Sequence, residues 1–385
     1  MRKTFLPFSP PYISREEIDE VVDTLSSDWI TTGPKTRNFE TEFAAFLGAE
    51  SALALNSCTA GLHLALVVLG IGGGDEVITT TNTFCSTVNV IEHVGARPVL
   101  VDVDPDTLNI APSLIEKAIT PKTRAIMPVH YAGHPCEMDK ILKIAKEHDL
   151  FVIEDAAHAF PAFYQNQPVG TIGDLTSFSF YATKNMTTAE GGMLTGDQQL
   201  IEKARVLSLH GMNRDAWKRY DKGGSWYYEI ESPGFKYNMT DIQASIGLQQ
   251  LKKMDSFQKR RHQIVNRYNV AFSECPCLKT PVEMPDVKSS WHLYVLRLNP
   301  ETLKISRDQF IEEMKDRNIG TSVHFIPIHI HPYYQRKYGY QPEDFPIAYS
   351  NFQRMISLPL YPRMSDNDVN DVIEAVLDVV KMYRR

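Results

Sequence analysis

The spacing of hydrophobic positions changes along the chain, and from Ser51 onward short apolar runs alternate with helical patterns. Such alternation is typical of a mostly parallel β-sheet covered by helices on both faces. The expected strands are 52–55, 76–79, 98–102, 125–129, 151–154, 175–180 and 192–195, and the expected helices between them include 60–69, 86–94, 112–118 and 138–147. We therefore predict an α/β fold built on such a sheet.

The segment before this region has a different pattern. Residues 1–50 are expected to form an arm, with a proline-rich start, a helix that begins at the capping box Ser14-Arg-Glu-Glu17, and a second helix through 39–47. Apolar residues recur at helical spacing in the first helix: Ile18, Val21, Val22 and Leu25. Further on, the glycine run 70–74 ends a predicted helix and precedes a strand, so it indicates a helix C-cap and turn rather than a dinucleotide-binding loop.

After Gly196 we expect a long helix, then a loop rich in Trp, Tyr and Gly at 217–235, and one amphipathic helix from Thr240 to about Phe272. Beyond Cys277 the pattern predicts a strand at 291–298, a helix at 306–317, a loop rich in His, Pro and Tyr, and a last helix from Asp366. The predicted organisation is an N-terminal arm (1–50), a large α/β domain (51–255) and a smaller α+β domain (256–385), with the boundary near 252–259.

Composition narrows the class of protein. The 385 residues are 43% hydrophobic and 23% charged, as in ordinary soluble proteins, and the net charge of −7 offers no basic surface for nucleic acid. No apolar run is long enough for a membrane span, and prolines interrupt residues 1–8 before a signal-peptide core could form, so we expect a cytoplasmic protein. The five cysteines lack the spacing of a redox or zinc motif, and we interpret them as reduced thiols.

Lys184 lies in an unusual environment for a lysine: Ser177-Phe-Ser-Phe-Tyr-Ala-Thr-Lys-Asn-Met-Thr-Thr-Ala-Glu-Gly-Gly192. An apolar run, expected to be a strand, precedes it, and small or hydroxyl-bearing residues follow it. Partial burial there would lower the pKa of the amine, as Schiff-base chemistry with a carbonyl compound requires. A lysine that merely ends a strand fits this segment equally well.

Two other segments place polar groups at the ends of expected strands. In Asn56-Ser-Cys-Thr-Ala-Gly61 a strand leads through a polar turn into a helix, where N–H groups and the hydroxyls of Ser57 and Thr59 could hold a phosphate. Simple N-capping of the helix explains the same residues. Asp155 follows the strand 151–154, at the position where ligands bind in open α/β sheets. A buried aspartate needs a cation, which is either a protonated pyridine nitrogen or an arginine, unless it caps a helix.

The C-terminal part contains His324-Phe-Ile-Pro-Ile-His329. A zinc site is not expected, because no nearby cysteine or acid completes a set of four ligands. We expect these histidines to form a polar pocket wall that hydrogen-bonds a hydroxylated substrate. Together, the phosphate turn, Asp155 and Lys184 are the parts needed to bind pyridoxal 5′-phosphate (PLP), which requires a phosphate site, a partner for its ring nitrogen and an amine for its aldehyde.

With these residues in view, the sequence resembles the DegT/StrS-type nucleotide-sugar aminotransferases over nearly its whole length. The motifs that support the resemblance are Trp29-Ile-Thr-Thr-Gly-Pro34, Gly74-Asp-Glu-Val-Ile78, Glu154-Asp-Ala-Ala-His158, 179–192 and Tyr237-Asn-Met-Thr-Asp-Ile-Gln243. The resemblance implies the PLP-dependent fold type I, with a mixed, mostly parallel seven-stranded sheet in the large domain. It also implies a homodimer whose active sites are each built from both chains.

The resemblance also implies roles for single residues. Lys184 would bind the aldehyde and later move the proton between Cα and C4′, and Asp155 would pair with the pyridine nitrogen. The other expected cofactor contacts are the Cys58–Thr59 turn and Ser179 at the phosphate, Phe84 and His158 at the ring, and Asn238 at the phosphate of the neighbouring subunit. Expected substrate contacts are Asn185, His324, His329 and Tyr333. Cys58 departs from the small-Gly-Thr turn of the family, and its side chain has no assigned part.

The implied reaction transfers the amino group of L-glutamate to a nucleotide-linked keto sugar. The motifs 128–133, 154–159, 210–211 and 319–325 are most similar to the branch acting on UDP-linked 4-keto sugars, typified by the 4-amino-4-deoxy-arabinose enzyme of lipid A modification. Phe84 replaces the tryptophan usual in that branch, which leaves the sugar open. The alternatives are a PLP-dependent sugar dehydratase, which would have histidine in place of Lys184, and a regulatory PLP-binding protein without turnover.

Overall fold

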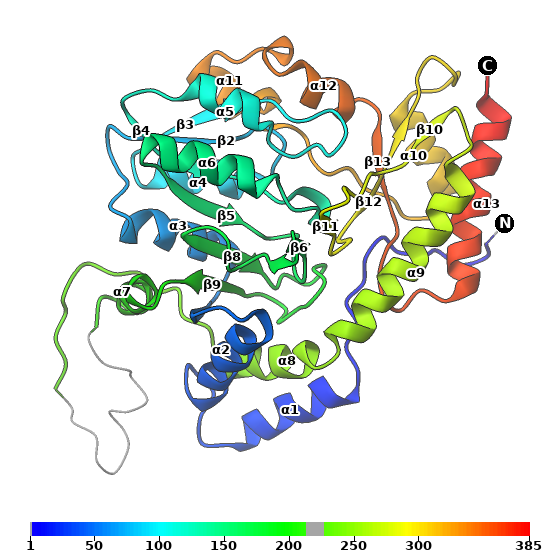
Figure 1. Cartoon of the computed structure of the whole chain (residues 1–385). Coiled ribbons are helices and arrows are strands. Elements are labelled where there is room, and N and C mark those ends of the chain that lie inside the picture. The colour runs from blue at the N-terminus through cyan, green and yellow to red at the C-terminus, as the bar shows by residue number, and fades with distance from the viewer. Residues whose placement is uncertain (1, 213–226) are drawn as a thin grey trace.

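The computed structural model describes residues 2–212 and 227–385 (Figure 1). The part of the predicted loop that includes Trp217, up to residue 226, lies outside the described residues. The central element is a seven-stranded sheet with the order β1-β9-β8-β5-β4-β2-β3. Its strands are β1 (Ser51–Leu55), β2 (Glu76–Thr80), β3 (Arg97–Val101), β4 (Thr123–Met127), β5 (Phe151–Asp155), β8 (Leu175–Ser179) and β9 (Gly192–Gly196).

All strands of this sheet except β9 run in the same direction. β9 pairs antiparallel with both β1 and β8, while the remaining neighbours pair in parallel. The prediction of a mostly parallel sheet is therefore confirmed, and all seven expected strands are present within a residue or two of their expected bounds. The shared direction brings the carboxyl ends of the other six strands to one edge, where β9 begins.

Helices cover both faces of this sheet, because successive apolar side chains of each strand point to opposite sides. One face packs against α3 (Cys58–Val68), α4 (Cys85–His93) and α7 (Gln198–Ser208). The other packs against α5 (Pro112–Ala118) and α6 (Met138–His148), and at the β1 and β9 side against α2 (Pro34–Leu47) and α8 (Asp241–Leu251). The glycine run is the expected turn: α3 ends just before it, and Gly70 and Gly74 have φ of +71° and +97°.

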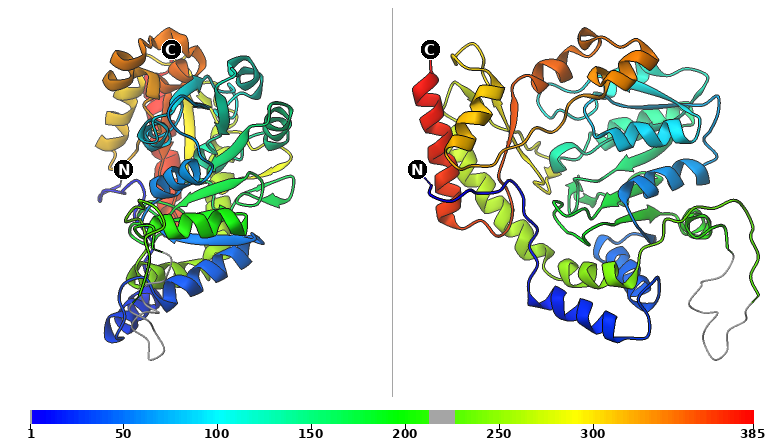
Figure 2. Two further views of the ribbon diagram at one scale, coloured as in Figure 1. Left: turned by 90° about the vertical axis from the view of Figure 1, so that its left-hand side faces the viewer. Right: turned by 180° about the vertical axis from the view of Figure 1, so that it is seen from behind.

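The C-terminal part is built around an antiparallel sheet of β10 (Leu278–Lys279), β12 (Tyr294–Leu298) and β13 (Met355–Leu358). α9 (Met254–Phe272), α10 (Arg307–Asp316) and α13 (Asp366–Tyr383) pack on it (Figures 1 and 2). The expected loop rich in His, Pro and Tyr instead contains short helices, namely η3 (Ile328–Ile330), α11 (Pro332–Tyr338), η4 (Pro342–Asp344) and α12 (Pro346–Phe352). These lie against the β3 side of the large sheet, where Asp102 accepts the N–H groups of Ile347 and Ala348.

Two further expectations need correction. The single helix expected from Thr240 to about Phe272 is two helices, α8 and α9, separated at Lys252 and Lys253. A small sheet of β11 (Val287–Lys288), β6 (Phe163–Tyr164) and β7 (Gln167–Pro168) was not expected, because its strands are too short to show a period. A single turn, η1 (Tyr131–Gly133), follows β4. The division into domains at 252–259 stays a prediction.

Asp241 joins two motifs that are far apart in the sequence. Its carboxylate accepts the N–H groups of Gly33 at 2.8 Å, Lys35 at 3.1 Å and Thr36 at 2.9 Å, and the hydroxyl of Thr36 at 2.6 Å. These N–H groups belong to the first turn of α2, which has no partner within its own helix. Asp241 is buried and thereby fixes the start of α2 against the start of α8.

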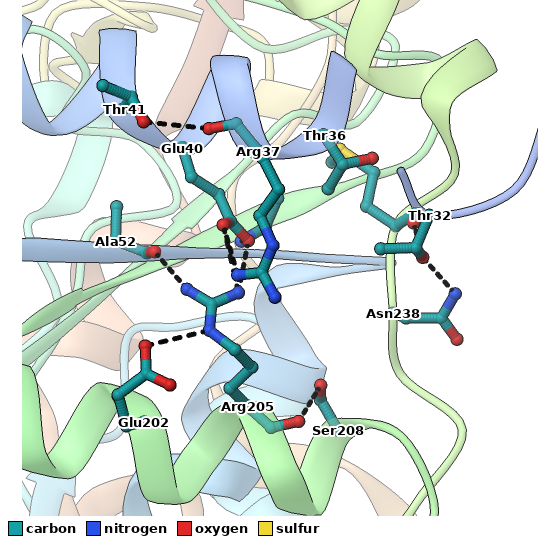
Figure 3. A network of polar contacts seen from close by, with 12 residues as sticks. Thr32, Thr36, Arg37, Glu40, Thr41, Ala52, Glu202, Arg205, Ser208 and Asn238 are labelled. Atoms are coloured by element: carbon teal, nitrogen blue, oxygen red, sulfur yellow. Dashed lines mark hydrogen bonds and ion pairs between the residues drawn. The ribbon is translucent and has the colours of Figure 1, made fainter. Parts of the chain in front are cut away.

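Neighbouring residues strengthen the same junction. Thr32 donates to the carbonyl of Met239 and accepts from the side chain of Asn238 at 2.6 Å (Figure 3). Arg205, from α7, binds both carboxylate oxygens of Glu40 in α2 at 3.0 Å and so ties α2 to the large sheet. The N-terminal arm is thus held to the large sheet by buried polar contacts.

Helix α1 (Arg15–Ser26) begins at the expected capping box, but it is oriented unusually. Its buried residues are polar: Glu17 accepts from Lys253 at 2.7 Å and from Gln250 at 2.8 Å. Three of its apolar residues face away from the chain: Ile18, Val22 and Leu25 are exposed by 47%, 54% and 57%. An amphipathic surface helix normally has the opposite orientation.

Replacing Asp241 with alanine tests the junction. The variant leaves the buried N–H groups of α2 without an acceptor, so we expect the free energy of unfolding to fall by about 2–3 kcal/mol in urea denaturation. The matched control is Asp255→Ala at the exposed start of α9, which should change it by less than about 0.5 kcal/mol. Equal stabilities of the two variants would show that Asp241 does not hold the junction.

Candidate active site

A cavity of about 520 Å³ lies at the carboxyl edge of the large sheet. This volume is in the range of small-molecule sites. The cavity is lined by residues at or after the ends of β1, β2, β4, β5 and β8. Glu190 and Gly191, just before β9, and His292, His324 and Phe325 of the C-terminal part complete the lining. Of the residues expected to touch the cofactor, it collects Cys58, Thr59, Phe84, Asp155, His158, Ser179 and Lys184.

Lys184 lies in the tight turn after β8. The N–H of Lys184 donates to the carbonyl of Tyr181 at 2.9 Å, and the N–H of Thr188 donates back to Phe180 at 2.9 Å. The side chain is half-buried and faces the cavity. Burial lowers the pKa of the amine to about 8, although the nearby carboxylate of Asp155 acts in the opposite direction. At pH 7 about a tenth of the amine is therefore neutral, and so nucleophilic.

Asp155, the last residue of β5, is buried at the floor of the cavity. Burial raises the pKa of its carboxyl group, while hydrogen bonds from Thr87 at 2.8 Å and from the N–H of Ala157 at 3.1 Å, and the charge of Lys184, lower it. The structure shows no ion pair between Asp155 and an arginine among the described residues, and the carboxylate does not cap a helix. Among the described residues, Lys184 and His130 are the positive groups that act on this carboxylate, and no arginine pairs with it.

The turn after β1 has the geometry of an anion site. The hydroxyl of Ser57 accepts the N–H of Ala60 at 3.1 Å, which makes Ser57 the N-cap of α3. Thr59 and Ser179 line the cavity beside this positive end of the helix. The two interpretations of the turn are compatible, because Ser57 caps the helix while Thr59 faces the cavity.

Gly192 allows a close approach that any larger residue would prevent. A Cβ atom there would lie 2.4 Å from the carbonyl carbon of Ser57 and 2.5 Å from the nitrogen of Cys58. Since real Cβ atoms do not approach backbone so closely, the start of β9 presses directly on the turn that begins α3. The Gly-Gly pair of the sequence therefore shapes the anion cradle.

The side chain of Cys58 lines the cavity and lies against the carboxylate of Asp155. Its sulfur lies 3.4 Å from the carbonyl of Ser177 and 3.9 Å from Oδ1 of Asp155. Burial, followed by the charge of Asp155, raises the pKa of the thiol, so it stays protonated. The cysteine thus fits the turn without adding a charge.

His292 was missed by the sequence analysis, yet it lines the cavity. Its Nδ1 lies 3.2 Å from Oδ1 of Asn185, whose amide nitrogen donates to the carbonyl of Ser290 at 2.8 Å. Because the amide oxygen can only accept, His292 must be protonated at Nδ1. His158 has the other tautomer, since its Nδ1 accepts the N–H of Ala132 at 3.2 Å. Their rings lie 4.4 Å apart.

The mouth of the cavity is formed by Phe84, His324 and Phe325. Phe84 is 58% exposed, and its ring centre lies 6.0 Å from that of Phe325. His324 lies 2.9 Å from the hydroxyl of Ser357, and burial lowers its pKa to about 4. Burial also lowers the pKa values of His158 and His292 well below the usual range. All three histidines are therefore neutral at physiological pH.

Four expected site residues lie outside this cavity. Asn185 orients His292, and Asn238 donates to Thr32. His329 is buried with Nδ1 2.7 Å from the hydroxyl of Thr81, and Tyr333 donates to Glu92 at 2.5 Å on α4. Their roles toward ligands stay predictions. Within the described residues no group of three or more histidines, cysteines or acids could hold a metal ion, and no helix is long and apolar enough to cross a bilayer.

The residues of the cavity match the chemistry of PLP. An amine of lowered pKa, a buried carboxylate without an arginine partner, and a helix start with two hydroxyls correspond to its aldehyde, its ring nitrogen and its phosphate. The order and direction of the strands complete the match, so the chain is placed among PLP-dependent enzymes of fold type I.

Comparison with known proteins identifies the family. A model of the DegT/DnrJ/EryC1/StrS aminotransferase family matches residues 11–377, and the chain belongs to this family. It is a PLP-dependent aminotransferase of the sugar aminotransferase type. The sequence is 57% identical over 382 residues to the spore coat polysaccharide biosynthesis protein SpsC of Bacillus subtilis, with 99% of this chain and 98% of that protein covered.

Solved structures agree with this assignment. The putative sugar aminotransferase Spr1654 from Streptococcus pneumoniae, in its PMP form, superposes with a TM-score of 0.92 and 40% identity, covering 98% of this chain and 99% of that one. The same protein was also solved in a PLP form. Helicobacter pylori PseC, an aminotransferase involved in the biosynthesis of pseudoaminic acid, superposes with a TM-score of 0.91 and 30% identity, covering 99% and 100%.

Replacing Gly192 with alanine tests the anion cradle. The added methyl group forces β9 away from the turn at Ser57. We therefore expect the dissociation constant of PLP, measured by equilibrium dialysis, to rise more than about tenfold. Gly73→Ala is the control, because a Cβ atom there meets nothing within 4 Å. Unchanged affinity in the Gly192 variant would contradict the role of this close approach.

Proposed function

We propose that this aminotransferase converts a nucleotide-linked keto sugar, UDP- or dTDP-linked, into the amino sugar, with L-glutamate as amino donor. The observation that supports it most directly is that Lys184 and Asp155 share one cavity with an anion cradle. The family and the sugar-linked names of its relatives add support. The presence of Lys184 rather than histidine disfavours the dehydratase alternative.

Each residue has a distinct task in this proposal. When bound, PLP supplies an aldehyde that takes up an amino group and a ring that spreads negative charge. Lys184 would hold the aldehyde carbon through its neutral amine and, when free, would carry a proton to and from the substrate carbon. Asp155 would hold the proton at the pyridine nitrogen. Thr59, Ser179 and the first turn of α3 would bind the phosphate, and Phe84 and His158 would contact the ring.

The wall of the cavity suits the hydroxyl groups of a sugar. His158, His292 and His324 are neutral and offer both donors and acceptors, as hydroxyl groups require. His324 keeps its predicted part as a substrate contact. In this proposal Asn185 acts through His292 instead.

The enzyme is proposed to work as a homodimer with shared sites. The apolar residues Ile18, Val22 and Leu25 form an exposed stripe on α1, and Phe84 is exposed at the mouth of the cavity. Exposed apolar groups of this kind mark surfaces that another protein covers. Asn238 lies outside the cavity of its own chain, which is compatible with its predicted contact to the partner's cofactor. Sedimentation should therefore give twice the mass of the chain.

The pH dependence of cofactor binding tests the assignment of Lys184. Only the neutral amine attacks the aldehyde, so the rate at which the apoenzyme binds PLP covalently should rise with pH and level off above about 8, as followed by visible absorbance. The Lys184→Ala variant should lose both the visible absorbance of covalently bound PLP and turnover. A variant that keeps them would refute the assignment.

Substrate choice is tested by a screen of UDP- and dTDP-linked keto sugars with L-glutamate, in which 2-oxoglutarate and the amino sugar are measured. Formation of both products from a nucleotide-linked sugar supports the proposal. Conversion of PLP to its amine form by glutamate, with no acceptor sugar used, would contradict the proposed acceptor. No reaction with glutamate at all would favour a regulatory PLP-binding protein.

A further inference from the structure

Thr87 is a buried residue of α4 whose hydroxyl contacts the carboxylate at the floor of the cavity. Its Oγ1 lies 2.8 Å from Oδ2 of Asp155 and 2.7 Å from Oγ1 of Thr83. An ionised carboxylate only accepts hydrogen bonds, so the single hydroxyl hydrogen of Thr87 points to Asp155. Thr83 must then donate to Thr87. The two hydroxyls form a chain with one direction, from Thr83 through Thr87 to Asp155.

This chain opposes the effect of burial. Asp155 is only 4% exposed, and burial alone favours its protonated form. The other groups that face it are the protonated thiol of Cys58 from α3, His130 after β4 and Lys184 after β8. The charge of Lys184 depends on whether its amine is free or bound to an aldehyde, so its support for the ionised carboxylate changes with that reaction. The hydrogen bond from Thr87 does not depend on that reaction.

We propose that Thr87 is a positioning residue for Asp155: its hydroxyl, oriented by Thr83, keeps the carboxylate ionised for the pyridine nitrogen of PLP. The inference rests on the proposed role of Asp155. Neither threonine was predicted from the sequence to act in the site. The sequence places both just after β2, far from Asp155, and only the fold brings α4 against the end of β5.

The test uses Thr87→Val, which has the same shape without the hydroxyl. Loss of a hydrogen bond to a charged group shifts its protonation equilibrium by about tenfold to a hundredfold. Protons should then compete for Asp155 at higher pH, so we expect PLP to bind the variant apoenzyme about tenfold more weakly at pH 6, with a smaller difference at pH 9. Thr87→Ser keeps a hydroxyl and should bind as the unmodified enzyme does.

A second readout separates positioning from a purely structural role. With PLP labelled at its ring nitrogen, the ¹⁵N chemical shift in the wild-type enzyme should indicate a protonated pyridine, and in Thr87→Val it should move toward the neutral ring at low pH. Thr83→Val leaves Thr87 in place but removes its donor, and should weaken PLP binding about threefold in the same pH-dependent way. If Thr87→Val fails to fold, Thr83→Val still tests the role of the hydrogen-bond chain.

The Asp155→Asn variant separates the role of Thr87 from the role of Asp155. If this variant loses PLP affinity and shifts the ¹⁵N signal while the Thr87 and Thr83 variants change neither, the role of Thr87 is overturned and that of Asp155 stands. If Asp155→Asn itself binds PLP with unchanged affinity and shift, the proposed role of Asp155 fails. Weaker PLP binding in Asp155→Asn across the whole pH range, together with losses in Thr87→Val and Thr83→Val that become smaller toward pH 9, supports the inference.

Discussion

The buried carboxylate of Asp155 is the constraint on which the arrangement of the site depends. An ionised acid away from water is costly unless donors and a cation surround it. The end of β5 is the place where such groups can converge, because parallel strands deliver their following residues to one edge of the sheet. Thr87 from α4, the N–H of Ala157 and Lys184 after β8 all reach the acid from different elements. The same edge brings the start of α3 into the cavity.

A second constraint concerns the N-terminal arm, none of whose described residues lines the cavity at the carboxyl edge. Asp241 holds the first turn of α2 against α8, and Arg205 binds Glu40 from the other side. The motifs around Trp29 and Tyr237, which are far apart in sequence, are therefore one structural unit. That unit also fixes Asn238 through Thr32. Polar contacts of Glu17 with Gln250 and Lys253, more than apolar burial, hold α1 against the rest of the chain.

Much of the fold could be predicted because the relevant signals are local. Alternating strands and helices, the glycine turn and the capping box each depend on neighbours in sequence, and Lys184 and Asp155 follow strands directly. Other features depend on contacts between distant segments. Thr87 and His292 have no distinctive local pattern, and the close approach of Gly192 to Ser57 exists only in the folded chain. The spacing of Ile18, Val22 and Leu25 predicted a helix but not that they would face away from the chain.

The reversed strand β9 has a consequence for how this site can change. The chain leaves β8, passes Lys184 and returns as β9 at Gly192, which presses on the anion cradle. The reactive amine and the shape of the phosphate site thus belong to one short hairpin. A substitution that moves this hairpin therefore changes the affinity for the cofactor and the reactivity of the lysine together. A change in only one of these two properties has to come from residues outside the hairpin, such as those of α4 or the cavity histidines His158, His292 and His324.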